Sequence, residues 1–353
     1  MKDSAIILTN GLLDTDMAKT CHGLLRGTER FDILGVIDPP HAGRDAGEVM
    51  DGKPRQIRVF ASVEGFLQQH SAKPRYCIVG VALPGGKLPD SFRAELFNAM
   101  RHGISIVNGL HTLLNDDAEF AAAARQYNVD ILDIRRPRPA SELRFWSGDI
   151  FSVRAPRIAV LGTDCALGKR TTCRFLMEMC NRNGISAQMI YTGQTGWMQG
   201  YPHGFIFDST LNDFISGEVE RAIVACDRES QPDLILIEGQ SALRNPSGPC
   251  GAEFILSGQA KGVVLQHAPG RLYYEGTEEF QYRIPPIESE IALIRAYGAE
   301  VLAVTLNEEG STDAELEAYR TQKEAELGIP FVRPLREGVE RLLPVIRDFV
   351  SGV

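Results

Sequence analysis

The chain has 353 residues, a length that favours two domains. Its 44% hydrophobic and 24% charged residues are typical of a soluble globular protein, and no apolar run is long enough to span a membrane. The net charge of −9 argues against nonspecific binding to DNA or RNA, which needs a basic surface.

The first part of the chain alternates strand and helix patterns. Apolar runs predict strands at 5–8, 33–37, 57–60, 76–81, 104–107 and 129–134. Periodic segments predict helices at 17–26, 63–69, 92–101 and 110–127. Such alternation is typical of a parallel sheet covered on both faces. The turn after the first strand lacks Gly-x-Gly-x-x-Gly, so we do not expect NAD binding.

A proline-rich segment then breaks the pattern. Pro137 and Pro139 favour extended chain and exclude a helix there. We therefore divide the chain into a first domain at 1–136, a linker at 137–156 and a second domain at 157–353.

The second domain repeats the alternation. Strands are predicted at 157–161, 187–191, 205–208, 234–237, 262–265, 301–306 and 331–332. Helices are predicted at 169–182, 213–227, 287–297, 313–327 and 339–350. The predicted fold class is α/β with two doubly wound domains. The first has a Rossmann-like parallel sheet and the second a P-loop NTPase-like parallel sheet.

A glycine-rich loop with a lysine lies between the strand at 157–161 and the helix that follows. This strand–loop–helix order is the layout of a P-loop, whose backbone N–H groups cradle a phosphate at the helix N-terminus. The predicted phosphate-binding residues are Gly162, Thr163, Asp164, Cys165, Ala166, Leu167, Gly168, Lys169, Arg170, Thr171 and Thr172.

The loop departs from the usual pattern. Five residues separate Gly162 from Gly168, where the usual spacing is four, and Arg170 stands where a Ser or Thr normally meets magnesium. This longer loop resembles that of dethiobiotin synthetase and related NTPases, whose loops begin Gly-Thr-Asp. Arg170 weakens the case for ATP hydrolysis more than the case for phosphate binding. The alternative is an ordinary strand-to-helix turn with Lys169 in solvent.

Polar residues at the ends of the predicted strands are the candidates for catalysis, because ligands of such sheets bind outside the carboxyl ends. Each also has a structural explanation as a surface charge, a helix-start residue or a core histidine. The candidates for proton transfer are Asp208, Asp213, Glu238 and His267. The candidates for substrate binding are Gly193, Gln194, Thr195, Gly196, Gln240 and Arg271.

Several of these segments, in this order, resemble a family formerly described as a domain of unknown function that includes D-glutamate N-acetyltransferase. The resemblance covers nearly the whole chain and rests on residues 19–23, 45–47, 109–111, 162–172, 193–196, 238–240 and 266–271. It implies a Rossmann-like domain followed by a P-loop domain. It also implies acetyl transfer from acetyl-CoA to the amine of D-glutamate or a related amino acid.

The resemblance suggests roles for the candidate residues. The loop would hold phosphates of CoA, and one of the four proton-transfer candidates would act as the base. Backbone N–H groups at 193–196 could stabilise the oxyanion, and Arg271 could bind a glutamate carboxylate. An ATP-dependent ligase or carboxylase and a non-enzymatic nucleotide switch stay open as alternatives.

The remaining expectations concern the protein's surroundings. We expect no bound metal of its own, with Mg²⁺ possible if a nucleotide binds. Seven cysteines without metal-type spacing indicate reduced thiols, and the N-terminus lacks a signal-peptide pattern, so we expect a cytoplasmic protein. We also expect a homo-oligomer that binds a small molecule and neither nucleic acid nor membrane.

Overall fold

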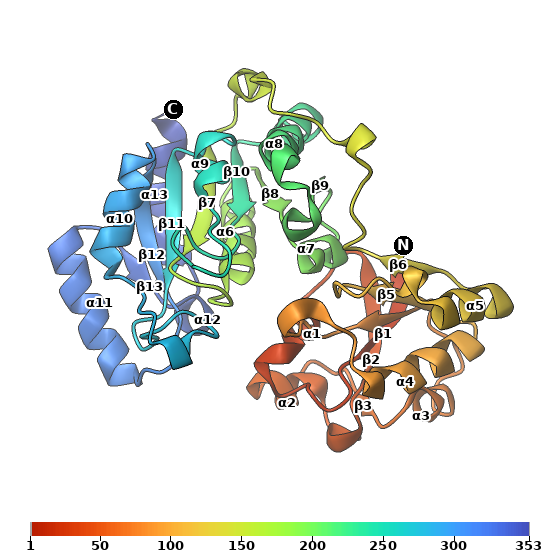
Figure 1. Cartoon of the computed structure of the whole chain (residues 1–353). Coiled ribbons are helices and arrows are strands. Elements are labelled where there is room, and N and C mark those ends of the chain that lie inside the picture. Colours follow the sequence, from red (N-terminus) through yellow and green to blue (C-terminus); the bar gives the residue numbers. More distant parts are fainter. Residues whose placement is uncertain (1, 353) are drawn as a thin grey trace. The chain divides into compact units, whose positions relative to one another are not determined.

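The computed structural model of the protein describes residues 2–352. It divides into two compact units, each with one parallel sheet (Figure 1). The first unit is the chain up to Pro137 together with Gln194–Pro202. The second is Arg138–Gly193 together with the chain from His203 onward. The two doubly wound parallel sheets confirm the predicted fold class.

The sheet of the first unit has six strands in the order β3-β2-β1-β4-β5-β6. They are β1 (Asp3–Leu8), β2 (Phe31–Ile37), β3 (Val59–Phe60), β4 (Tyr76–Val79), β5 (Ser105–Asn108) and β6 (Ile131–Asp133). The strand order reverses between β1 and β4. Sheets of this kind bind ligands at such a reversal, outside the carboxyl ends of the strands.

Helices cover both faces of this sheet. They are α1 (Lys19–Leu25), α2 (Ala46–Asp51), α3 (Val63–Leu67), α4 (Asp90–Arg101) and α5 (Ala118–Tyr127). One core joins Phe66, Leu96 and Phe120 of α3, α4 and α5 to one face, and α1 and α2 contribute to the core on the other. The helix predicted at 110–127 begins only at 118, where the Asp117 carboxylate accepts from the first-turn amides.

The helix α7 (Gln194–Gln199) belongs to the first unit although its sequence lies between strands of the second. Met198 of α7 is fully buried in one core with Ile78 and Val107. The Gln199 amide donates to the Gly23 carbonyl at 2.9 Å, which fixes α7 beside α1. The sequence analysis predicted substrate-binding residues but no helix here, so α7 was missed. It completes the face of the sheet that α1 and α2 cover only in part.

The second sheet has seven strands in the order β13-β12-β11-β7-β10-β8-β9. They are β7 (Arg157–Gly162), β8 (Ala187–Tyr191), β9 (His203–Gly204), β10 (Leu234–Glu238), β11 (Gly262–His267), β12 (Glu300–Leu306) and β13 (Phe331–Val332). The helices are α6 (Lys169–Arg182), α8 (Ile215–Ser230), α9 (Ala252–Leu256), α10 (Ile287–Ala296), α11 (Asp313–Leu327), α12 (Pro334–Glu337) and α13 (Leu343–Ser351).

The strand predicted at 205–208 is wrong. β9 pairs with β8 only at His203 and Gly204, because β8 ends at Tyr191 and offers no further partner. The chain then enters a 3-10 turn at Phe207–Ser209.

The segment expected to be a linker packs against the second unit from Arg138 on. Arg138 donates to the carboxylate of Glu218 at 2.7 Å, and the amides of Ser147 and Ile150 donate to Glu220 at 2.7 and 3.1 Å. Both glutamates lie on α8 and are buried. These contacts attach residues 138–152 to the surface of α8.

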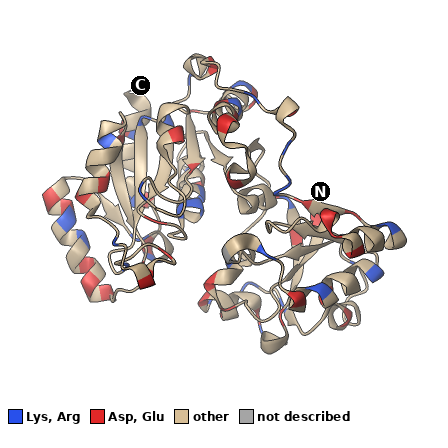
Figure 2. Ribbon diagram, in the orientation of Figure 1, with Lys and Arg blue, Asp and Glu red and all other residues tan. Residues whose placement is uncertain are grey.

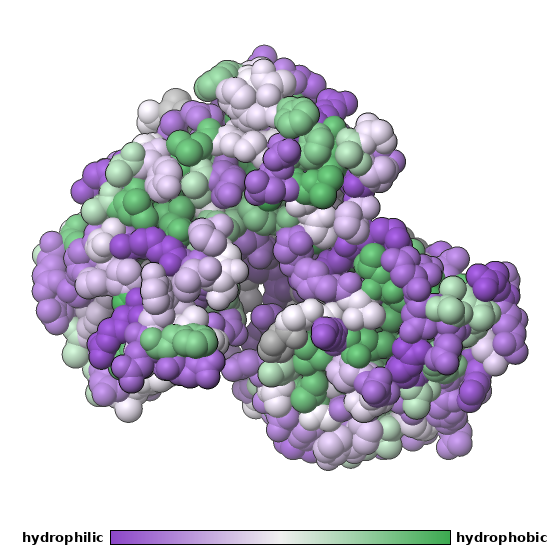
Figure 3. Space-filling model, viewed as in Figure 1, coloured by the Kyte–Doolittle hydropathy of each residue, from purple (hydrophilic) through white to green (hydrophobic). Residues whose placement is uncertain are grey.

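The surface mixes charges of both signs, as Figure 2 shows along α11. Figure 3 shows hydrophobic patches among hydrophilic residues on both units. Within residues 2–352 no helix combines the length and the apolar character that a membrane span requires. The same residues contain no group of three His, Cys, Asp or Glu side chains able to hold a metal ion.

Because Met198 is buried in the core of the first unit, a cavity made by shortening its side chain should destabilise that unit. Met198→Ala should destabilise the first unit by about 2–5 kcal/mol, because it removes a fully buried side chain. Met189→Ala on β8 is the matched control, and it should loosen only the second unit. Hydrogen exchange measures both; faster exchange of β4 and β5 in the control would contradict the assignment of α7.

Candidate functional site

The candidate site lies where the carboxyl ends of three adjacent strands meet. β7 runs between β10 and β11 and leads into the glycine-rich loop. Glu238 ends β10 and His267 ends β11. The sheet therefore brings these two predicted residues to either side of the loop.

The two glycines of the loop allow its turn into α6 and the close approach of Lys169. Gly168 has φ = 98°, a left-handed conformation that glycine adopts without strain, and it precedes the first residue of α6. A Cβ on Gly162 would lie 3.2 Å from Lys169 Nζ. Lys169 is 7% exposed, and its ammonium donates to the Asp164 carbonyl at 2.6 Å. Burial lowers the pKa of Lys169.

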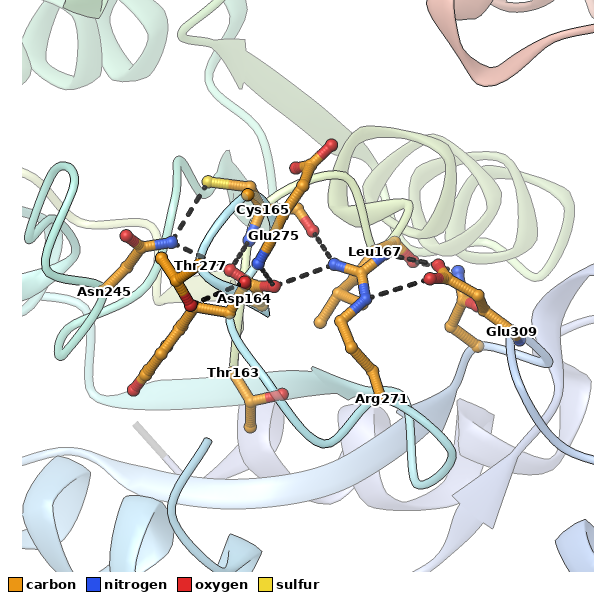
Figure 4. A network of polar contacts seen from close by, with 12 residues as sticks. Thr163, Asp164, Cys165, Leu167, Asn245, Arg271, Glu275, Thr277 and Glu309 are labelled. Atoms are coloured by element: carbon orange, nitrogen blue, oxygen red, sulfur yellow. Dashed lines mark hydrogen bonds and ion pairs between the residues drawn. The ribbon is translucent and has the colours of Figure 1, made fainter. Parts of the chain in front are cut away.

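The carboxylate of Asp164 is the centre of the polar network in Figure 4. It is fully buried and accepts four hydrogen bonds. Its Oδ1 accepts from the Cys165 amide at 2.7 Å and from Asn245 Nδ2 at 2.8 Å. Its Oδ2 accepts from Arg271 Nη1 at 2.9 Å and from the Glu275 amide at 2.8 Å. One side chain thus ties the loop to two other segments.

The guanidinium of Arg271 lies between two carboxylates, as Figure 4 shows. It pairs with Asp164, donates to the Cys165 carbonyl at 2.8 Å, and binds Glu309 through Nε and Nη2. Four of its five N–H donors therefore have protein acceptors. Binding of a substrate carboxylate stays a prediction, but these contacts make Arg271 a residue that positions the loop.

Several backbone donors of the loop have no acceptor. Within residues 2–352 the amides of Ala166, Leu167 and Gly168 donate to no protein group. They precede α6, a helix of 14 residues whose N-terminus adds a positive dipole. Consecutive unused amides, a helix N-terminus and a buried lysine together form an anion-binding arrangement.

Glu238 is buried beside this loop. Its Oε2 accepts from the Thr192 amide at 3.0 Å, and the Gly193 amide also donates to the carboxylate. Burial raises the pKa of Glu238 above its ordinary value, and the charges of Arg170 and Lys169 oppose that rise. A carboxyl group with a raised pKa can take up a proton near neutral pH.

The neighbouring side chains on β11 support the loop. Gln266 Oε1 accepts from Thr172 Oγ1 at 2.6 Å and from Thr305 at 2.7 Å. His267 Nδ1 lies 3.0 Å from Thr163 Oγ1. Burial lowers the pKa of His267 to about 4, so its imidazole is neutral at pH 7 and a weak base.

The other two proton-transfer candidates lie at the far edge of the sheet. Asp208 and Asp213 are exposed in 3-10 turns that follow the edge strand β9, and one strand, β8, separates β9 from β10. The prediction placed Asp208 at a strand end, which the shorter β9 rules out. The sheet does not bring these two residues to the loop.

The predicted substrate-binding residues divide between the two units. Gly193 and Gln240 belong to the second unit, where Gln240 Nε2 donates to Thr192 Oγ1 at 2.9 Å. Residues 194–196 form the start of α7 in the first unit. Stabilisation of an oxyanion by backbone N–H groups at 193–196 stays a prediction.

Sequence reasoning missed three residues of the network. Asn245 and Glu309 lie in loops, far along the chain from Asp164, and Thr192 precedes the singled-out glycine. No spacing or motif marks them, because their contacts arise only when the strand ends meet.

The paired burial of Asp164 and Arg271 predicts a strong energetic coupling. Asp164→Asn or Arg271→Met should each lower the free energy of unfolding of the second unit by about 3–5 kcal/mol, because each leaves a buried partner uncompensated. The double variant should lose less than the sum. Denaturant titration in a Trp197→Phe background, where Trp146 reports the second unit, checks this; strictly additive losses would exclude the pair.

His267 predicts a pH dependence of stability. Its pKa is about 4 in the fold and about 6.5 when unfolded, so the unfolded chain takes up the proton first. Stability is complete above pH 6.5 and falls by up to about 1.4 kcal/mol per pH unit as the pH drops towards 4. His267→Asn should reduce the dependence of the free energy of unfolding on pH, measured between pH 4 and 7. An unchanged dependence would show that His267 is not its source.

Comparison with known proteins places the chain among relatives of the same architecture. The family model described as the DUF1611_C P-loop domain, a domain of unknown function, matches residues 144–343. The DUF1611_N Rossmann-like domain model matches residues 39–137. The crystal structure of a DUF1611 family protein from Anabaena variabilis is 29% identical, with a TM-score of 0.88 over all of both chains.

Two relatives carry a functional name. A D-glutamate N-acetyltransferase of Tritonibacter scottomollicae is 28% identical, covering 78% of this chain and 82% of its own. A D-glutamate N-acetyltransferase of a Pseudoalteromonas species is also 28% identical, covering 75% and 79%. The match of the P-loop model to more than half of the residues shows that the chain belongs to the DUF1611 family.

Proposed function

We propose that the protein is an N-acetyltransferase that moves the acetyl group of acetyl-CoA to the amino group of D-glutamate or a related amino acid. The observation that carries the proposal is the loop itself, with unused amides at 166–168, the N-terminus of α6 and buried Lys169. The names of the two relatives supply the reaction class.

The loop suits the phosphates of CoA. An anion there would meet the three unused amides and could draw the Lys169 ammonium away from the Asp164 carbonyl. The Thr172 hydroxyl donates a hydrogen bond to Gln266 Oε1 and is therefore not directed at a magnesium ion. This favours phosphate binding over magnesium-dependent phosphoryl transfer. In acetyl transfer the phosphates serve only to bind CoA, so no bond to phosphorus breaks.

Glu238 is the best candidate for the base. Attack by the substrate amine forms an N–C bond and breaks the C–S bond of the thioester, and the nitrogen must lose a proton. Glu238 is buried with a raised pKa, whereas His267 is a weak base and the two aspartates lie beyond the edge strand. The proton passes from nitrogen to Glu238, and CoA leaves as its thiolate.

An ATP-dependent ligase or carboxylase is the second candidate, since a buried acid at the end of β10 also suits a magnesium–nucleotide site. Calorimetry with acetyl-CoA and with Mg-ATP separates the two. We expect acetyl-CoA to bind in the micromolar range; binding of Mg-ATP without binding of acetyl-CoA would refute the transferase.

Lys169 should govern the use of acetyl-CoA. Lys169→Met should raise the KM for acetyl-CoA by about 10–100-fold with a smaller change in kcat, because it removes a charge-assisted contact made in substrate and transition state alike. The assay follows thiol release with D- and L-amino acids. Lys261→Met, at an exposed position, is the matched control. An unchanged KM in Lys169→Met would contradict the role of the loop.

Glu238 should govern the chemical step. Glu238→Gln should lower kcat by at least about 100-fold and leave the KM for acetyl-CoA nearly unchanged, since the amide cannot accept the proton. The wild-type rate should fall on the acidic side as Glu238 becomes protonated. If Glu238→Gln kept both the wild-type kcat and the fall in rate at acidic pH, another residue would have to be the base.

A further inference from the structure

The first unit contains a buried polar cluster that the phosphate site does not use. Thr20 on α1 is 1% exposed, and its hydroxyl lies 3.2 Å from that of Thr195 on α7, which is 4% exposed. The Cys21 amide donates to the Gly80 carbonyl at 2.8 Å, which places this turn of α1 at the end of β4. The cluster therefore lies beside the reversal of strand order.

Gln194 provides a second, independent sign of a ligand. It is 7% exposed, and within residues 2–352 its side-chain amide has no hydrogen-bond partner. The side chain lies against Gly109 at the end of β5, where an added Cβ would come within 2.9 Å of Gln194 Cγ. Glycine at this position lets the amide lie over the strand end.

Cationic groups occur at the same edge of the sheet. Lys19 is the exposed first residue of α1, and it forms no ion pair with any described residue. Arg135 follows β6, and its guanidinium donates to the Gly109 carbonyl. Two cations and a neutral amide suit a small molecule with two carboxylates.

We propose that this cluster, made of Thr20, Gln194, Thr195 and Gly109 with Lys19 and Arg135 at its edge, binds the acceptor as a dicarboxylic amino acid. This deepens the proposed function and rests on it.

Titration calorimetry of the full chain with D-glutamate, without acetyl-CoA, tests the site. Gln194→Met keeps the length of the side chain and removes its amide, and Gln68→Met on the exposed surface is the matched control. We expect Gln194→Met to weaken D-glutamate binding at least about tenfold and the control to leave it unchanged. Glutarate, which has both carboxylates and no amine, should compete with D-glutamate.

Steady-state kinetics separates this site from the phosphate site. In Gln194→Met the KM for D-glutamate should rise while the KM for acetyl-CoA stays the same, and Thr20→Val should act alike if Gln194→Met fails to fold. Unchanged D-glutamate affinity and KM in both variants would overturn the site while the transferase stands. Weakened D-glutamate binding in a protein without transferase activity would instead refute the proposed reaction and keep the site.

Discussion

The buried carboxylate of Asp164 is the interaction on which the candidate site depends. It accepts from Cys165 in its own loop, from Asn245 in the segment after β10, and from Arg271 and Glu275 after β11. A buried charge is stable only when its hydrogen-bonding capacity is satisfied. Satisfying Asp164 fixes three segments at once, so the shape of the loop is set before any ligand arrives.

The same network explains why the loop can differ from the common P-loop. The extra residue and Arg170 would disturb a loop held only by its own turn. Here Arg271, which lies outside the loop, forms an ion pair with Asp164 of the loop. Glu309 forms a second ion pair with Arg271. The loop can therefore keep amides 166–168 free for an anion without a magnesium-binding hydroxyl at position 170. In the proposed function the loop binds the phosphates of CoA, and no phosphate is a leaving group.

Much of the fold could be predicted from the sequence, because strand and helix periods are local. The bounds of α11 follow from the capping box at Thr312 and from Gly328, and both are visible in the sequence. α7 could not be predicted, since six residues carry too little periodicity and its stability comes from the core around Met198. In the candidate site, the position of Glu238 could be predicted because it directly follows an apolar strand pattern. The contacts of Asn245 and Glu309 could not, because their partners are distant in the sequence.

The amides proposed to bind phosphate and the proposed base lie in the second unit, and the polar cluster of α7 lies in the first. The most direct test of the central claim is a crystal structure of the chain with CoA. The account predicts pyrophosphate or ribose-phosphate oxygens on the amides of 166–168, with Lys169 Nζ moved from the Asp164 carbonyl to phosphate. CoA bound away from the loop, with Lys169 still on that carbonyl, would contradict it.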